Sequence, residues 1–168
     1  MSRRETVVDD ALSRSIDTIA ETCIAVRLRL VNRVVTTIYD DALRPLGLKV
    51  SQLNILIVTA KLGLARPAQV CDILQLEAST LSRNVKPLQA NGWLEVVPHA
   101  DARAQPFRLT PRGQRLIEKA VPAWEAAQRQ ATALLGDKGI GMLDRAARKL
   151  RQSRPGPGAH RQGQARSS

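Results

Sequence analysis

The side chains best suited to binding an anion lie between residues 78 and 86, in the sequence ASTLSRNVK. In a helix the apolar residues of this region would share one face, because Leu81, Val85 and Leu88 are spaced at i, i+4 and i+7. The opposite face would then present hydroxyls and cations without an acid, whereas a solvated helix face normally mixes both signs of charge. Hydroxyls in a first helical turn can bind phosphate oxygens, and an arginine in mid-helix can reach base edges. We therefore predict a DNA-binding helix whose contacts come from Ser79, Thr80, Ser82, Arg83, Asn84 and Lys86.

A second group of polar side chains lies between two short extended runs, residues 93–97 and 107–109. The residues between them, PHADARAQP, are rich in loop formers, so the runs are predicted to pair as a hairpin with a basic tip. Asp101 is predicted to shape this hairpin rather than touch DNA, because a carboxylate would repel phosphate. The loop residues predicted to meet DNA are His99, Arg103 and Gln105.

Short signals around these two groups define the elements that must position them. An apolar helical face at residues 70–74 precedes the DNA-binding helix, and the three residues 75–77 leave room only for a sharp corner. Asn91-Gly92 is typical of a helix end, and Thr110-Pro111 is typical of a helix start. The predicted fold class is mostly α with a small β-hairpin wing, that is, a winged helix-turn-helix.

This arrangement resembles the multiple-antibiotic-resistance-regulator (MarR) family of bacterial transcription factors over about residues 18–150. The wing carries the specific part of the resemblance, because Asp101, Arg103 and Ala104, then Leu109-Thr110 and Gly113, follow the family signature D-x-R-A/S…L-T-x-x-G. The stretch STLSRNVKPLQANGWL is similar to the family's recognition helix and the start of its wing. The chain departs from the family at Ala102, where a second Arg is usual. It also carries Pro87, which removes a hydrogen bond inside the recognition helix and is expected to bend it.

The resemblance implies a homodimer that binds a pseudo-palindromic operator in double-stranded DNA, as a repressor relieved by a small-molecule effector. The family's pocket lies between the dimer helices and the winged module, and here it would draw on Arg27, Arg33, Tyr39 and Trp124. Some relatives sense peroxide through a Cys near the start of the first helix, and Cys23 lies near that place. The Tyr residues that support such a thiolate are absent around Cys23, so a packing role is favoured over a redox one.

Hydrophobic periodicity divides the rest of the chain. Residues 1–15 are predicted to be a flexible N-terminus, and 16–47 to hold one long dimerisation helix with more apolar surface than one chain can cover. The winged domain is predicted over 48–113, with Lys49 at the cap of a nearly all-apolar helix. Two C-terminal dimerisation helices, separated at Gly136, are predicted over 114–152, and a disordered basic tail over 153–168.

Composition limits the class of partner. Four aromatic residues among 168 argue against binding of single-stranded nucleic acid, which relies on stacking. The net charge is +11, but seven Lys or Arg and no acid follow from Arg145 onward, which leaves +4 on residues 1–144. The placement of cations on the 79–86 face and in the wing is therefore a stronger indication of double-stranded DNA than the total charge.

Other classes of function find little support in the sequence. Two cysteines make no disulfide framework, and Cys71 is predicted to pack at the helix crossing. No signal peptide or membrane span is found, so a cytoplasmic, nucleoid-associated protein without a membrane partner is expected. With two His in the chain a metal at His99 is not favoured, no cofactor is predicted, and the absence of a Ser-His-Asp elbow, HExxH or Walker loop argues against an enzyme.

Two alternatives to an effector-responsive repressor stay open: an effector-independent architectural DNA-binding protein, and a redox-sensing regulator that uses Cys23. In each of these DNA-binding alternatives Arg83 and Arg103 are expected to act differently. Arg83, in mid-helix, is expected to read base edges in the major groove, whereas Arg103, on the loop, is expected to enter the minor groove.

Overall fold

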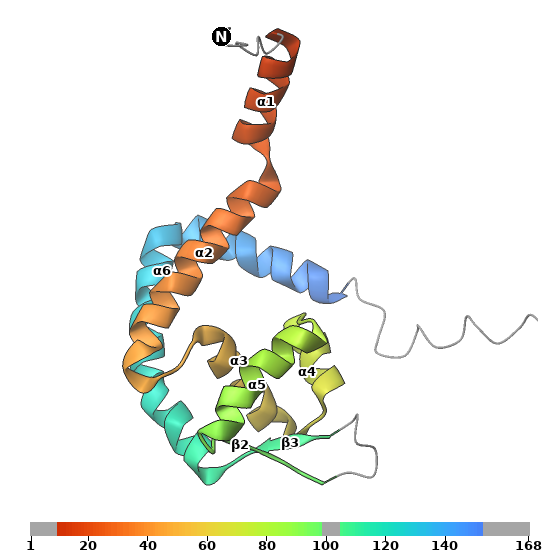
Figure 1. Cartoon of the computed structure of the whole chain (residues 1–168). Helices are drawn as coiled ribbons and strands as arrows, with labels where there is room; N and C mark the ends of the chain where they lie inside the picture. Colours follow the sequence, from red (N-terminus) through yellow and green to blue (C-terminus); the bar gives the residue numbers. More distant parts are fainter. Residues whose placement is uncertain (1–9, 99–104, 153–168) are drawn as a thin grey trace, which may run out of the picture. The chain divides into compact units, whose positions relative to one another are not determined.

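The computed structural model describes residues 10–98 and 105–152 (Figure 1). The chain divides into two compact units, Met1–Thr37 and Ile38–Ser168, and the boundary falls inside the second helix. The predicted fold class is confirmed, since helices dominate and the strands form one small sheet. No helix within the described ranges is long and apolar enough to cross a bilayer. The elements are α1 (Asp10–Thr22), α2 (Ile24–Leu43), the 3-10 helix η1 (Arg44–Leu46), α3 (Val50–Leu62), β1 (Leu64–Ala65), α4 (Pro67–Leu74), α5 (Ala78–Ala90), β2 (Leu94–Val96), β3 (Phe107–Leu109) and α6 (Pro111–Gln152).

Two helices, α1 and α2, stand where the sequence predicted one long helix within residues 16–47. Helix α1 already begins at Asp10, and the helix is interrupted at Cys23 before α2 begins. Residues 10–15, which the sequence assigned to a flexible N-terminus, form the first part of α1. Asp10 places a negative charge in the first turn of α1, and the Ser15 hydroxyl donates to the carbonyl oxygen of Ala11 at 2.9 Å. Every side chain of α1 is exposed, including the large apolar ones Leu12, Ile16 and Ile19.

In the second unit α3 lies at the centre of the hydrophobic core. Ile55 and Leu56 are fully buried, and the core cluster around them includes residues of α4, α5, all three strands and the start of α6. Among the described residues Thr59 is the one polar residue that is buried, and its hydroxyl donates to the carbonyl oxygen of Ile55 at 2.8 Å, so no hydrogen bond is lost to burial. The enclosure of α3 by these elements explains why its sequence has almost no polar face.

The wing is a three-stranded antiparallel sheet with strand order β1-β3-β2, where the sequence predicted only a two-stranded hairpin. Leu64 pairs with Arg108 and Ala65 with Phe107. A strand of two residues has too few positions to show an alternating pattern, and its partner β3 is more than forty residues away. Tertiary pairing therefore creates β1.

At the start of α3 the backbone N–H groups find hydrogen-bond acceptors although the cap position holds no good capping residue. Lys49 occupies the cap position, and its side chain makes no capping hydrogen bond. The Oδ1 of Asp40, at the end of α2, instead accepts from the backbone N–H of Val50 at 2.7 Å. The Oε1 of Gln52 accepts from the N–H of Lys49 at 3.0 Å. Two side chains from outside the cap position thus replace the Ser or Thr that would be expected there.

The corner between α4 and α5 is as sharp as the three-residue spacing predicted. Gln75 ends α4 in the left-handed conformation with φ 55°, and its backbone N–H bonds the carbonyl oxygen of Cys71. Glu77 then precedes α5, and its carbonyl oxygen accepts from Thr80 N–H at 2.9 Å. A left-handed residue at the end of one helix therefore lets the next begin three residues later.

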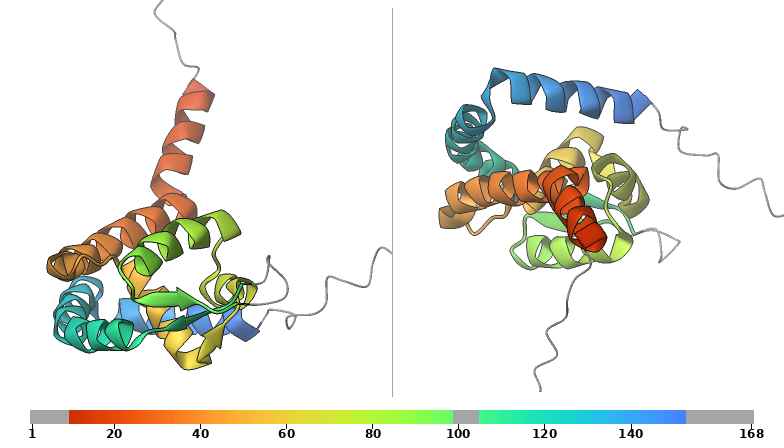
Figure 2. Two further views of the ribbon diagram at one scale, coloured as in Figure 1. Left: turned by 60° about the horizontal axis from the view of Figure 1, so that its bottom comes forward. Right: turned by 90° about the horizontal axis from the view of Figure 1, so that it is seen from above.

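Helix α6 is two helical segments that meet at Gly136, where the sequence predicted a helix–helix corner. Gly136 has φ 64° and ψ 167°, a conformation that is open almost only to glycine. Figure 2 shows the long helix changing direction sharply along its length. At Pro122, where the sequence predicted a bend, the helix continues, and Gly136 is the residue of α6 with non-helical dihedral angles.

We predict that Gly136→Ala lowers the free energy of unfolding by about 1–3 kcal/mol, because alanine would be strained in this conformation. No atom lies within 4 Å of the added Cβ, so the effect would be purely conformational. Gly141→Ala is the matched control. Its Cβ would meet only the end of Arg145 at 3.4 Å, so better helix propensity should stabilise the protein by about 0.5–1 kcal/mol. Urea unfolding at one fixed protein concentration measures both. Two shifts of the same sign would contradict this account of the corner.

Candidate nucleic-acid interface

Helix α5 has one buried face and one exposed face, as its periodicity predicts. Leu81, Val85 and Leu88 are buried in the core shared with α3. Four polar side chains of α5 lie on the exposed side, and none carries a negative charge. We call them the reading face: Ser79, Ser82, Arg83 and Lys86.

Arg83 is held over the first turn of its own helix. Its Nη2 donates to the Thr80 hydroxyl at 3.2 Å, and its Nε lies 3.3 Å from the carbonyl oxygen of Ser79. Helical side chains lean toward the N-terminus, which brings the guanidinium beside the hydroxyls of this turn. Cation, hydroxyls and free N–H groups at the start of α5 are thus gathered in one place, a combination suited to phosphate or to a base edge.

Asn84 is placed differently from the other predicted contacts, since it is only half-exposed and is already bonded on both ends of its amide. Its Nδ2 donates to the carbonyl oxygen of Thr80 at 2.9 Å, and its Oδ1 accepts from the hydroxyl of Ser51 on α3 at 3.1 Å. Ser51 was not predicted as a site residue. Its partner lies 33 residues away, so no local pattern in the sequence could have found it.

The base of the wing is fixed by backbone pairing and one ion pair. Glu95 and Arg108 face each other across β2 and β3, with Nε and Oε1 2.5 Å apart. This pair is exposed, so its contribution to stability is small, but it neutralises the charge of Arg108. Gln105 is exposed beside the wing, whereas the predicted residues His99, Asp101 and Arg103 lie outside the described residues.

Thr110 and Gly113 join the wing to α6. The hydroxyl of Thr110 donates to the carbonyl oxygen of Gly92 at 2.7 Å and accepts from the N–H of Gly113 at 3.0 Å, so it caps α6 and ties it to the end of α5. A Cβ on Gly113 would lie 2.2 Å from the carbonyl oxygen of Trp93. The L-T-x-x-G part of the signature thus has a structural cause: the Thr caps the helix and the Gly permits its close approach to the wing.

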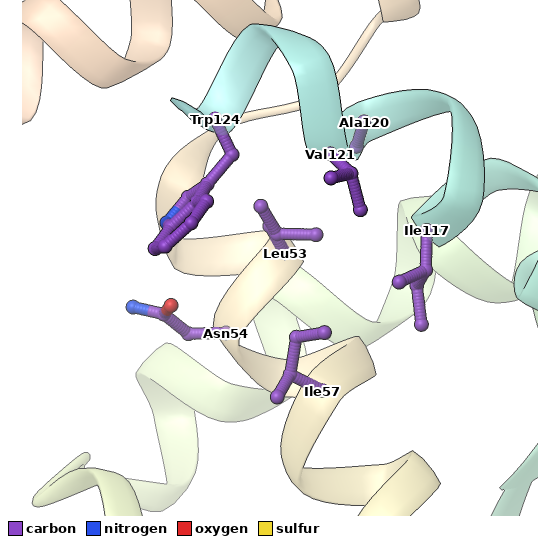
Figure 3. Close-up of a pocket in the computed structure, with 7 residues that line it drawn as sticks. All are labelled: Leu53, Asn54, Ile57, Ile117, Ala120, Val121 and Trp124. Carbon is purple, nitrogen blue, oxygen red and sulfur yellow. The ribbon is translucent and has the colours of Figure 1, made fainter. Parts of the chain in front are cut away.

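A separate cavity of about 300 Å³ lies between α3 and α6 (Figure 3). Of the four residues predicted for a ligand pocket, Trp124 lines this cavity, and Arg27, Arg33 and Tyr39 do not. Tyr39 instead donates its hydroxyl to Oε1 of Gln128, and burial raises the pKa of this phenol. In Figure 3 the ring of Trp124 and the amide of Asn54 lie near each other at one end. The lining residues, none of them charged, are Leu53, Asn54, Ile57, Ile117, Ala120, Val121 and Trp124.

The two cysteines occupy different settings. Cys23, half-buried, is the residue at which the helix between α1 and α2 is interrupted. Cys71 packs against the core near the crossing of α4 and α5, as predicted. Burial raises the pKa of the Cys71 thiol, and the nearby carboxylates of Asp72 and Glu77 raise it further. A raised pKa lowers the thiolate fraction at neutral pH, which agrees with a packing role for Cys71.

The fold and the reading face together define a winged helix-turn-helix protein. The family model described as the MarR family matches residues 46–105, so the resemblance predicted from the sequence is confirmed over this segment. The family match covers α3, β1, α4, α5 and β2.

Two named relatives match part of the chain. An uncharacterised HTH-type transcriptional regulator, YwoH of Bacillus subtilis, is 28% identical over 87 residues, which are 52% of this chain and 64% of that protein. The multiple antibiotic resistance protein MarR of Salmonella typhimurium is 26% identical over 91 residues, 54% of this chain and 63% of that protein. The match therefore spans less than two thirds of either relative.

Solved structures share the fold over more of the chain. A mutant of E. coli MarR in complex with operator DNA has a TM-score of 0.69 at 19% identity, and covers 79% of this chain and 96% of its own. A structure of BpsR from Bordetella bronchiseptica, described as showing how 6-hydroxynicotinic acid regulates its DNA binding, has a TM-score of 0.68 at 20% identity. It covers 77% of this chain and 94% of its own.

We predict that Gly113→Ala lowers the free energy of unfolding by about 1–3 kcal/mol, because its Cβ would overlap a backbone oxygen and the Leu109 side chain, at 2.2 and 2.7 Å. Gln114→Ala, at the exposed neighbouring position, is the matched control and should change stability by less than about 0.5 kcal/mol. Thermal and urea unfolding measure both variants. Equal stability of Gly113→Ala and wild type would show that the wing can move away from α6 at no cost.

Proposed function

We propose that this protein is a transcriptional regulator that binds a pseudo-palindromic operator in double-stranded DNA as a homodimer. The observation that carries this proposal is the acid-free reading face on α5 within a MarR-family winged segment. A relative in fold, E. coli MarR, has a structure in complex with operator DNA. In this chain the proposed contacts from α5 are those of the reading face with Thr80, and those from the wing are His99, Arg103 and Gln105.

The proposed homodimer accounts for apolar surface that each unit leaves uncovered. In the N-terminal unit Ile19, Ile24 and Leu30 are 64%, 71% and 62% exposed. In the second unit Leu134, Met142 and Leu150 on α6 are 57%, 58% and 69% exposed. Monomeric proteins rarely present so many large apolar side chains along their helices, and a second copy of the chain would remove them from water.

We further propose that the protein is a repressor relieved by a small-molecule effector bound between α3 and α6. The cavity is at the small end of the usual range for ligand sites, and its walls are apolar apart from Asn54. An aromatic ring could stack on Trp124 while a polar substituent bonds the Asn54 amide. Because no charged side chain lines the cavity, the ligand class that fits is a small, neutral, planar molecule with one hydrogen-bonding group.

Selection of bound duplexes from a random pool tests the DNA-binding proposal, and we expect a consensus with two-fold symmetry. Arg83→Ala should then relax discrimination at one position of each half-site by about 1–3 kcal/mol. Arg103→Ala should weaken binding to consensus and scrambled duplexes by similar factors, because minor-groove contacts respond mainly to groove shape and potential. Titrations at several salt concentrations measure both.

Two outcomes of the selection would count against this proposal. A pool without any consensus would favour the architectural alternative. A consensus whose half-site preference is lost in Arg103→Ala and kept in Arg83→Ala would mean that the helix and the wing had been assigned to the wrong grooves.

The effector proposal predicts a difference between two closely related probes. 6-hydroxynicotinic acid and its neutral amide have the same ring, so their comparison isolates the charge. We expect the amide to bind more tightly, because burial of an unpaired carboxylate is costly, and to quench the fluorescence of Trp124. Trp93, which is buried in the core, provides an internal reference.

Trp124→Ala is the control for this site. It should weaken binding of the amide by about two- to tenfold, from the loss of roughly 0.5–1.5 kcal/mol of stacking. Tighter binding of the acid, or quenching that persists in Trp124→Ala, would place the ligand elsewhere.

A further inference from the structure

A hydrogen-bonded link crosses between α3 and the recognition helix α5. The Ser51 hydroxyl, on the second residue of α3, donates to Asn84 Oδ1 at 3.1 Å. Asn84 Nδ2 then donates to the carbonyl oxygen of Thr80 at 2.9 Å. The Thr80 carbonyl fixes which way the amide points, since only the nitrogen of the amide can donate to it. The oxygen of Asn84 must therefore face Ser51.

This link ends directly beneath the reading face. Asn84 follows Arg83 in the helix, and Thr80 accepts from the guanidinium of Arg83 through its hydroxyl. The other residues of α5 buried against the core are Leu81, Val85 and Leu88, whose packing is apolar and has no preferred direction. A hydrogen bond does have a preferred direction and length, so it can fix the rotation of α5 about its own axis where the apolar contacts do not.

We propose that Ser51 is a positioning residue for DNA recognition, which acts through Asn84 to set the direction in which Arg83 and Ser79 face. The inference rests on the proposed function. It also gives Asn84 a different role from the one predicted from the sequence: it connects α3 to the reading face and does not itself contact DNA. Both ends of its amide are engaged within the protein, and its side chain is half-buried.

The test compares the full-length wild type with Ser51→Ala, Asn84→Ala, the double variant and Ser51→Thr. For each protein the dissociation constants for the selected consensus and for a scrambled duplex are measured, together with the melting temperature. We expect Ser51→Ala to lower the ratio of consensus to scrambled affinity by about two- to tenfold, the value of one hydrogen bond, with little change for the scrambled duplex. The double variant should be no worse than Asn84→Ala alone, because both remove the same link. Ser51→Thr keeps the hydroxyl and should restore the ratio.

Each other outcome overturns the inference in a distinguishable way. Effects of Ser51→Ala and Asn84→Ala that add in full would mean that Asn84 touches DNA directly. An equal loss of affinity for both duplexes, together with a lower melting temperature, would mean that Ser51 only stabilises the fold. A wild type that discriminates, with Ser51→Ala equal to it, would overturn this inference and leave the proposed function intact. A wild type that does not discriminate between the duplexes would overturn both.

Discussion

The burial of α3 is the constraint on which the rest of the winged unit depends. This helix contacts α4, α5, α6, β1 and β3, and between Leu53 and Thr59 most of its side chains are removed from water. A helix so enclosed must have its free backbone groups satisfied by neighbours, because an unpaired buried polar group costs about 1–3 kcal/mol. Asp40 and Gln52 meet this need at its start, and Thr59 bonds back within the helix. Among the described residues, no buried side-chain polar atom is left without a partner.

Because α3 is fixed in this way, it can serve as a common support for two sites of different chemistry. Its first turn carries Ser51, which is hydrogen-bonded to Asn84 on α5. Leu53, Asn54 and Ile57 form one wall of the cavity that α6 completes. The reading face is polar, cationic and open, whereas the cavity is apolar and is lined by no charged side chain. The same buried helix therefore contributes to both, although neither site is built mainly from α3.

The wing and α6 are joined by an approach so close that one side-chain atom would prevent it. Gly113 packs against the carbonyl oxygen of Trp93, and Thr110 bonds to Gly92 from the same turn. The strands of the wing are two and three residues long, too short to be stable alone. Their position therefore comes from this junction and from the burial of Leu94 and Phe107. The L-T-x-x-G part of the family signature therefore reflects how the wing is attached to α6.

Some features of this protein follow from the sequence by itself because they depend on local spacing. The period of Leu81, Val85 and Leu88 sets which side of α5 is exposed, the three residues 75–77 set the sharp corner, and Gly136 separates two helical segments.

Tertiary structure alone decided features that join distant residues. β1 exists because β3 is beside it, Asp40 caps α3 from another helix, and Asn84 turns to Ser51 instead of outward. The break at Cys23 could not be predicted from the periodic pattern either, because the apolar stripe continues across it. The backbone hydrogen bonds from Arg27 N–H to the Cys23 carbonyl and from Cys23 N–H to the Ile19 carbonyl are kept. Periodicity reports which face a residue occupies, whereas hydrogen bonds between elements depend on distances that no local spacing encodes.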